Sequence, residues 1–450
     1  MTDTAAGAPR AFTDPGWRRR VILAVYGYQG LVAGFGLTAL PNHLAALGAA
    51  PGAIGGLAAM IGLPWALQPL WGPVVDGHGG FRMGRRRAWV VAGMAGALLC
   101  LALLPLAGDG PAAIPRLGPI LMAHAVFAAL LDTALDGMII DRTPRARLGQ
   151  ATALTRMGFV GGTALGAASF AWAIPALGLP RAALLLLLLG AVLATLPFSV
   201  REAPGDALLS LRRRPEAAAA ARLPLGRMLR RLLFVMRRRE ALALVALCIA
   251  LEFATAVFGV RLAIEMIQAG GWDPAALSRL QGGIAVLGGT LGALVIGWWS
   301  DRAGPYRVLL RLLGLCAAAY AGSAWLLVGP PSGLPSSIAL ALTSIVPALV
   351  FVSLAPAVMR SSRGAAAATR FALFMAALNL GSALGAASSG PVGALLRPWQ
   401  TVLLSAAIFA GCTLVALRPA RLFRDPEAGT VPASPRNGSV SAPAAETVLR

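Results

Sequence analysis

Residues 72–76 read Gly72-Pro-Val-Val-Asp76, and after seven further residues the chain continues Gly84-Arg85-Arg86-Arg87. This polar stretch separates two long apolar runs. A related stretch, Gly297-Trp-Trp-Ser-Asp301-Arg302, follows another apolar run, and the glycines and the aspartates of the two copies are each 225 residues apart (72 to 297 and 76 to 301). A repeat spaced by half the chain predicts a duplicated architecture, in which two halves of similar fold follow one another.

The composition excludes a soluble globular protein. Of the 450 residues, 57% are hydrophobic and only 13% are charged, and the mean hydropathy is +0.73. Soluble domains keep about a quarter of their residues charged, whereas this apolar content would fill about twelve spans of roughly 20 residues. Because unpaired backbone cannot lie in lipid, the spans must be helical. Apolar runs of that length lie at about 21–44, 52–75, 87–107, 117–139, 150–174, 179–199, 241–268, 275–299, 307–328, 334–358, 366–390 and 398–418.

The sequence therefore predicts an all-α membrane protein with twelve transmembrane helices in two pseudo-symmetric halves of six. The expected parts are an N-terminal tail (1–20), an N-terminal half (21–199), a basic loop (200–240), a C-terminal half (241–418) and a disordered tail (419–450). Within the basic loop, leucines share one helical face with arginines nearby over residues 226–240. That segment is either an amphipathic helix lying on an anionic membrane surface or a solvated linker.

The charge indicates how the chain is oriented. The formal net charge is +21, and all 39 cationic side chains are arginines. If the N-terminus is cytoplasmic, thirty-three arginines fall in cytoplasmic segments, four in external loops and two within spans. The positive-inside rule then predicts that both termini are cytoplasmic. We expect a monomer in a bacterial inner (plasma) membrane, in contact with the lipid bilayer and not with nucleic acid.

Other functional classes find no support in the residues. All four cysteines lie inside apolar runs, without the CxxC spacing of a metal or redox site, and read as buried small hydrophobes. The three histidines are too dispersed for a metal site. The sequence contains no HExxH, GxSxG or P-loop motif. We therefore expect neither an enzyme nor a cofactor.

The paired loop motifs, together with twelve spans, resemble the loop 2–3 signature of the major facilitator superfamily and its weaker echo at loop 8–9. The resemblance implies two six-helix halves that rock about a central cavity. The charged loops would act as a latch that forms in one conformation and breaks in the other. The expected latch residues are Gly72, Asp76, Gly84, Arg85, Arg86, Gly297, Asp301 and Arg302.

Three further stretches look like the muropeptide permease (AmpG-type) branch and its siderophore-permease and acetyl-coenzyme A transporter relatives. They are Leu63-Pro-Trp-Ala-Leu-Gln68-Pro-Leu-Trp71, then Asp132-Thr-Ala-Leu-Asp136-Gly137 with Arg156-Met-Gly158, and finally Phe371 to Gly381, which contains Asn379. This sequence has Gln68 where the branch usually has lysine, and Arg370 where it usually has glutamine. The resemblance implies import of a polar or amphipathic solute of the muropeptide or siderophore class.

Ionisable groups inside membrane spans are costly, and for that reason they are functional candidates. Asp132 and Asp136 share one helix face, and Arg156 lies about two turns into the next span, at a similar depth. These three form either a proton-coupling relay or a structural ion-pair cluster. Glu252, near the middle of its span, is either a proton or substrate site or a protonated acid bonded to a neighbouring helix.

The remaining polar positions inside spans allow two interpretations. Arg261 and Glu265 are spaced to form a structural pair or an outer gate. Tyr26, Tyr28, Gln29, Gln68 and Asn379 either line a cavity or pack between helices. Taken together, these features predict a proton-driven secondary transporter that imports a small solute. The rival hypotheses are a non-transporting assembly or receptor protein on the same scaffold, and an exporter.

Overall fold

The computed structural model describes residues 10–78, 80–144, 148–214, 230, 239–361 and 367–417. Within these ranges the chain is helical, and its only β-type pairings are isolated bridges. Most of the expected segment 226–240 and the whole tail 419–450 lie outside the described residues. The all-α prediction is therefore confirmed for the part of the chain that the structure describes.

The N-terminal half contains six rod-like segments, two of them interrupted. They are α1 (Pro15–Gly34) with a π-helical turn (Phe35–Ala39) and α2 (Leu40–Ala46), α3 (Pro51–Ala66) with a 3-10 turn (Gln68–Leu70) and α4 (Trp71–Gly77), α5 (Arg87–Leu103), α6 (Ile114–Arg142), α7 (Leu148–Leu177) and α8 (Leu179–Ser199).

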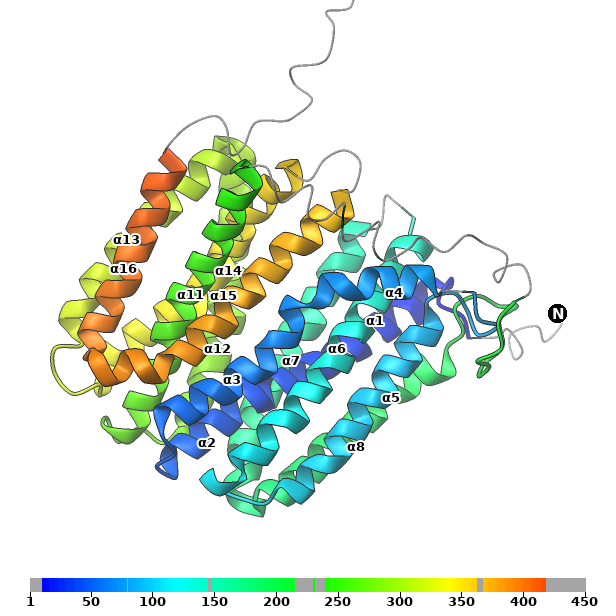
Figure 1. The fold of residues 1–450 in the computed structure, drawn as a ribbon, viewed down its shortest axis with the longest axis horizontal. Helices are drawn as coiled ribbons and strands as arrows, with labels where there is room; N and C mark the ends of the chain where they lie inside the picture. The colour runs from blue at the N-terminus through cyan, green and yellow to red at the C-terminus, as the bar shows by residue number, and fades with distance from the viewer. Residues whose placement is uncertain are drawn as a thin grey trace, which may run out of the picture.

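The C-terminal half contains six further helices, which are α11 (Arg239–Gln268), α12 (Pro274–Ala303), α13 (Pro305–Leu326), α14 (Gly333–Ser361), α15 (Ala367–Leu395) and α16 (Pro398–Leu417). Figure 1 shows the two halves side by side, the first in blue to cyan and the second in green to red. Among the described residues, eleven helical segments are long and apolar enough to cross a membrane. α12, with 30 residues, packs among them against α7 and α14.

Prolines account for the two interrupted rods. Pro41 has no backbone N–H and its ring crowds the preceding turn, so the helix widens locally and Leu40 bonds back to the Phe35 carbonyl in a π-turn. In the second rod, Pro64 and Pro69 flank the point where α3 ends and the 3-10 turn begins. The backbone is thus irregular near the end of the span Pro51–Leu70, where the polar residue Gln68 lies.

Glycines set the closest helix contacts, and they do so in the same way in both halves. A Cβ atom on Gly30 of α1 would lie 2.1 Å from the Phe159 carbonyl oxygen of α7, so only glycine permits this approach. The pair α11 and α15 repeats it, because a Cβ on Gly381 would lie 2.3 Å from the Ile249 oxygen. The duplication predicted from the loop motifs is thus matched by equivalent helix packing.

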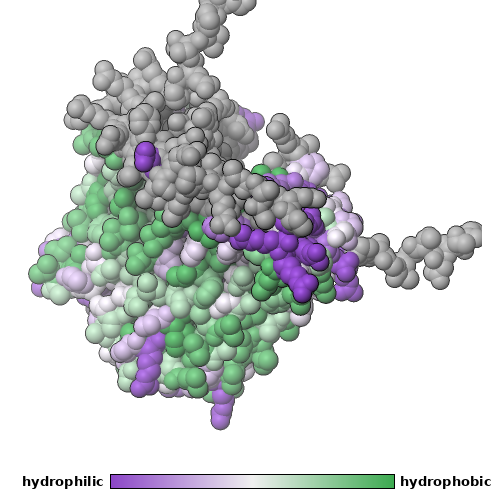
Figure 2. Space-filling view, turned by 45° about the vertical axis from the view of Figure 1, so that its right-hand side comes forward, coloured by the Kyte–Doolittle hydropathy of each residue, from purple (hydrophilic) through white to green (hydrophobic). Residues whose placement is uncertain are grey.

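The two halves meet along α3 with α15 and along α7 with α12. A Cβ atom on Gly55 of α3 would lie 2.3 Å from the Ala386 oxygen of α15, which shows how closely the halves approach there. Many apolar side chains of the described residues are exposed, including Leu165, Val192 and Leu291. Figure 2 shows one face of the molecule on which apolar residues predominate and hydrophilic residues gather toward the edges, as expected of a surface that faces lipid.

Candidate intramembrane polar site

Two carboxyl groups of α6 lie at the centre of the candidate site, and each accepts a short hydrogen bond from another segment. The Tyr26 hydroxyl of α1 donates to Asp136 Oδ1 at 2.5 Å, and Gln68 Nε2 donates to Asp132 Oδ2 at 2.6 Å. Asp132 is only 8% exposed. Gln29 lies beside Asp132, and its buried Nε2 has no hydrogen-bond partner among the described residues. Four of the residues singled out from the sequence therefore form one group, namely Tyr26, Gln68, Asp132 and Asp136. Gln29 lies at the edge of this group.

The break in the second rod places Gln68 against Asp132. Pro69 has no N–H to give to the carbonyl of Trp65, four residues earlier. Asn379 of α15 donates its Nδ2 to this carbonyl at 3.3 Å. The expected polar residue of the eleventh span thus contacts the helix break of the other half, while Gln68 at the same break contacts Asp132.

Arg156 of α7 completes the group on the side of the C-terminal half. Its guanidinium lies 4.4 Å from the ring centroid of Phe351 in α14, and it interacts electrostatically with Tyr26, Asp132 and Asp136. Its side chain is exposed, and among the described residues no carboxylate lies within 4.0 Å of it. We call Tyr26, Gln68, Asp132, Asp136 and Arg156 the α6 cluster. Phe351 was not singled out from the sequence, because a lone aromatic residue in an apolar run carries no polar signal.

Tyr28, two residues beyond Tyr26, lies elsewhere. Its hydroxyl is 2.8 Å from His124 Nε2, both side chains are buried inside the N-terminal half, and its ring packs against Gly190 of α8. Two residues along a helix correspond to a rotation of about 200°, which turns Tyr28 away from the α6 cluster. The structure therefore separates Tyr28 from the other expected cavity residues.

The acidic and basic residues of α11 form separate sites. Glu252 is half-buried and interacts electrostatically with Cys248 on its own helix and with Tyr320 of α13. Arg261 and Glu265 form a salt bridge at the spacing expected from the sequence, and Arg261 Nη2 also donates to the Gly393 carbonyl at 3.3 Å. Among the described residues no three histidine, cysteine or acidic side chains come together as metal ligands would.

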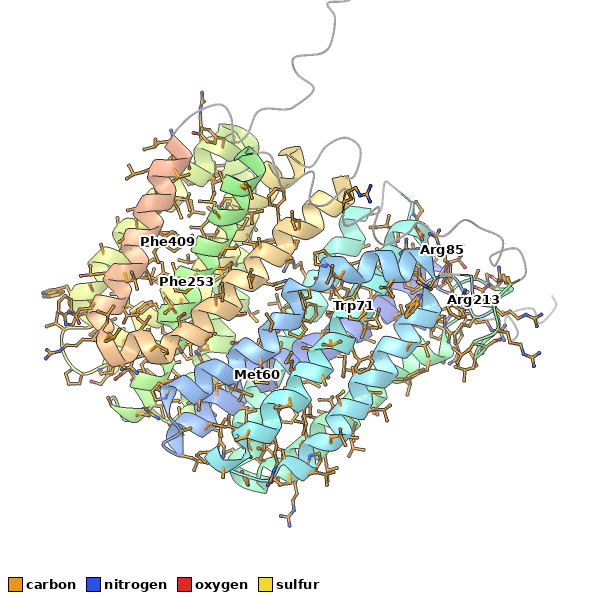
Figure 3. The ribbon with its side chains drawn as sticks, viewed as in Figure 1. Met60, Trp71, Arg85, Arg213, Phe253 and Phe409 are labelled. Atoms are coloured by element: carbon orange, nitrogen blue, oxygen red, sulfur yellow. The ribbon has the colours of Figure 1, made fainter. Side chains whose placement is uncertain are left out.

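The loop that carries the first latch motif packs onto the N-terminal half. Arg86 Nε bonds to Asp141 Oδ2 of α6 at 2.6 Å, and Gly84, with φ of +116°, lies against Glu202. Figure 3 places Arg85 and Arg213 at this same end of the half. Residues 200–214, the first part of the basic loop expected at 200–240, pack against this half, where the Arg201 N–H donates to the Arg10 carbonyl at 2.8 Å and the Arg82 N–H to the Arg212 carbonyl at 2.9 Å. The partners Asp141 and Glu202 were missed because they are remote in sequence.

The rest of the latch is only partly visible. The side chains of Asp76 and Asp301 and the environment of Gly297 lie outside the described residues. A Cβ atom added to Gly72 would meet nothing within 4 Å among the described residues. Arg302 lies 4.0 Å from the ring centroid of Trp298, on its own helix. The idea that these loops make and break a contact between conformations stays a prediction.

Four side-chain hydrogen bonds join the halves at the end of the molecule opposite the N-terminus. Asn42 of α2 donates to Ser278 Oγ at 2.8 Å and to Gln281 Oε1 at 2.9 Å on α12. Gln268, the last residue of α11, donates to the carbonyls of Ala45 at 3.1 Å and Ala49 at 2.9 Å. We call this set the distal clamp. It had not been singled out from the sequence, because amides near span ends are common.

Solved structures with the same fold include several transporters. A mutant form of the nucleoside transporter NupG aligns with a TM-score of 0.64 at 16% identity, covering 89% of this chain and 99% of that one. A POT family transporter in complex with a thioalcohol-conjugated peptide gives 0.65 at 11%, with 91% and 97% covered. The human organic anion transporter MFSD10 gives 0.58 at 19%, with 90% and 100% covered.

The sequence itself matches a family model over most of its length, and this match agrees with the duplicated helical halves. The matching model is that of the Major Facilitator Superfamily, and it covers residues 22–386. This range spans the α6 cluster, both latch motifs and the distal clamp. The chain therefore belongs to the major facilitator superfamily, whose members are transporters rather than enzymes.

Proposed function

We propose that this chain imports a polar or amphipathic small solute together with protons, by alternating access. The observation that carries the proposal is the α6 cluster, in which two carboxyls one helical turn apart are held inside the membrane by Tyr26 and Gln68. Two like charges at this separation in a medium of low dielectric favour retention of a proton. Carboxyl groups so placed are suited to take up and release protons as their access to water changes.

The interface between the halves supports alternating access. The distal clamp joins the halves at one end, and the α6 cluster lies deeper, between that clamp and the N-terminal end. Rocking of one half against the other would break the clamp and expose the same cluster to the opposite side. On the distribution of arginines, we place the N-terminal end in the cytoplasm of a bacterial inner membrane, with the protein acting as a monomer.

The class of solute is proposed from two sources. The AmpG-type sequence resemblance favours muropeptide-like sugars or siderophores. The structural relatives carry names that mention nucleosides, a conjugated peptide and organic anions, all of them polar molecules of modest size. A polar solute also suits a site lined by tyrosine, glutamine and arginine side chains.

The test is uptake by proteoliposomes that contain the full chain, with an imposed pH gradient. The solutes offered are an anhydro-muropeptide, a ferric siderophore, a nucleoside and a dipeptide. Uptake of at least one should be driven by an inward proton gradient and abolished by a protonophore. Asp132→Asn and Asp136→Asn should remove the response to the gradient, while Arg181→Gln, at an exposed position at the start of α8, should keep it.

The rival functions give different results in the same system. Uptake that is unaffected by the protonophore would contradict proton coupling. Solute accumulation in everted but not in right-side-out vesicles would identify an exporter. Failure of all four solutes to move, combined with unchanged cellular function of Asp132→Asn and Glu252→Gln, would favour a non-transporting role.

A further inference from the structure

Arg156 of α7 and Arg261 of α11, which the sequence predicts to lie in spans, have different partners. Arg261 is neutralised by the adjacent carboxylate of Glu265. Arg156 has the ring of Phe351 as its close partner, and its side chain is exposed. An arginine stacked on an aromatic ring still presents the edge of its planar guanidinium, with donors in a fork that matches a carboxylate. Arg156 therefore has donors left for a solute at the interface between the halves.

The position of Arg156 is that of a residue between the two halves. At a rise of 1.5 Å per residue, Arg156 lies about 12 Å along α7 from the N-terminal end of that helix. Phe351 lies about 15 Å along α14 from its C-terminal end, which is the corresponding end of that helix. The two residues come from different halves, so a solute held between them would contact both. Rocking of the halves would change the distance between the Arg156 guanidinium and the Phe351 ring, and hence the affinity for the solute.

The charge of the α6 cluster depends on its protons. The titratable groups that interact with Arg156 are Tyr26 on α1 and Asp132 and Asp136 on α6, while α14 contributes the uncharged Phe351. With both carboxyls protonated the cluster carries one positive charge, and with both ionised it carries one negative charge. An anion is attracted in the first state and repelled in the second.

We propose that Arg156 and Phe351 bind an acidic group of the transported solute, preferably a carboxylate next to an apolar or ring-like body. This inference rests on the proposed import function and gives it a solute class, an organic anion. Because the anion and the protons favour one another at the same cluster, solute binding loads protons and proton loading strengthens solute binding. Coupling then follows from electrostatics between Arg156, Asp132 and Asp136.

The test is a binding measurement on the purified full chain in detergent, separate from transport. The probes are matched pairs that differ by a carboxylate: N-acetylmuramic acid with N-acetylglucosamine, and the dipeptide Ala-Phe with its C-terminal amide. Affinity is read from thermal stabilisation as a function of probe concentration. At pH 6 we expect at least one acid to bind about tenfold or more tightly than its neutral counterpart, the range of a charge-assisted hydrogen bond.

Substitutions identify the residues responsible. Arg156→Gln should abolish the preference for the acid, and Arg156→Lys should retain part of it, since lysine keeps the charge but loses the planar fork. Phe351→Leu should weaken binding of the acid several-fold without reversing the preference. Arg181→Gln removes a cation elsewhere in the same half and should change nothing. Asp132→Asn combined with Asp136→Asn should make the affinity for the acid independent of pH, whereas in the wild type it should fall as the pH rises.

Two outcomes would overturn the inference. One is that no acid binds more tightly than its neutral partner, and the other is that Arg156→Gln retains the preference. Either result leaves proton-driven uptake of a neutral solute intact, so the proposed function would survive. Conversely, an acid that binds through Arg156 but is never transported would contradict the proposed function while upholding the binding site.

Discussion

The Glu202 carboxylate caps the helix that begins at Arg87. Its Oε2 accepts the backbone N–H of Arg87 at 3.0 Å, and that of Arg86 at 2.9 Å, while its Oε1 forms a salt bridge of 2.9 Å with Arg142. In return the buried guanidinium of Arg87 donates to the carbonyl of Val200 at 2.5 Å. The first latch loop is thus fastened to the end of the sixth span by side chains on both sides.

We predict that Glu202→Ala lowers the free energy of unfolding by about 2–3 kcal/mol, because it removes a helix cap and a partly buried ion pair. Thermal unfolding of the purified protein in detergent would measure the loss. Glu202→Gln keeps an acceptor oxygen for the backbone donors and should lose about half as much. Equal stability of the alanine variant and the wild type would show that the cap contributes little.

Tyr26→Phe removes the donor that stabilises ionised Asp136. Protonated carboxyl should then persist to higher pH, and the pH at which proton-driven uptake falls to half should rise by about one pH unit. The measurement is uptake against pH in proteoliposomes. Tyr28→Phe provides the matched control, because Tyr28 bonds to His124 inside the half and not to the cluster. A pH profile that moves equally in both variants would contradict the role assigned to Tyr26.

Much of the fold follows from the sequence, because membrane spans have a strong local signal. A run of apolar residues determines a helix wherever it lies, and the repeated Gly and Asp positions marked the two halves. The pairing of Asp132 with Asp136 was likewise predictable, since i and i+4 lie on one helix face. Arg261 and Glu265 illustrate the same rule, and they form the expected salt bridge.

The sequence could not show which distant residues meet. Tyr26 and Tyr28 look alike in a Tyr-Gly-Tyr motif, and only the rotation of α1 against α6 and α8 separates them. Phe351 and Asn42 contact partners more than a hundred residues away, and Glu202 contacts Arg87 and Arg142, which are 115 and 60 residues away. Such contacts depend on how helices rotate and pack, which is a tertiary property without a local pattern.

Pro69→Ala should restore a backbone donor for the Trp65 carbonyl and allow the second rod to continue as a regular helix. A proline within a helix costs about 3 kcal/mol relative to alanine, so the variant should be at least as stable as the wild type. It should nevertheless transport several-fold more slowly, because a straightened helix withdraws Gln68 from Asp132. Gln68→Ala should slow transport without raising stability. A Pro69→Ala variant with full activity would show that the break is not needed.

Tyr320 presents the same chemical group as Tyr28 in an opposite situation. Its hydroxyl is buried without a hydrogen-bond partner among the described residues, and its ring lies 5.3 Å from that of Phe409. Tyr320→Phe should therefore be neutral or stabilise the protein by about 1 kcal/mol, whereas Tyr28→Phe should destabilise it by a similar amount. Thermal unfolding of the two variants side by side provides the measurement. Destabilisation by Tyr320→Phe would indicate that this hydroxyl has a hydrogen-bond partner. Glu252 is the nearby acidic residue.

The distal clamp makes a prediction about conformation. Asn42→Ala combined with Gln268→Ala removes four hydrogen bonds between the halves and should favour the state that is open at that end. Ser389 is fully buried there, where its Oγ lies 2.3 Å from the position of a Cβ on Gly55 of the other half. A cysteine at position 389 should therefore react with a polar maleimide only when the halves separate.

We expect the clamp substitutions to raise the labelling rate of Ser389→Cys by about tenfold or more, since each lost hydrogen bond contributes about 1 kcal/mol. The four native cysteines are buried, so background labelling should be low. Ser405→Cys is the matched control, because Ser405 is equally buried but bonds to Ala254 within the C-terminal half. Faster labelling at both positions would signal general loosening. Faster labelling at position 389 alone identifies the clamp as the contact that holds this end closed.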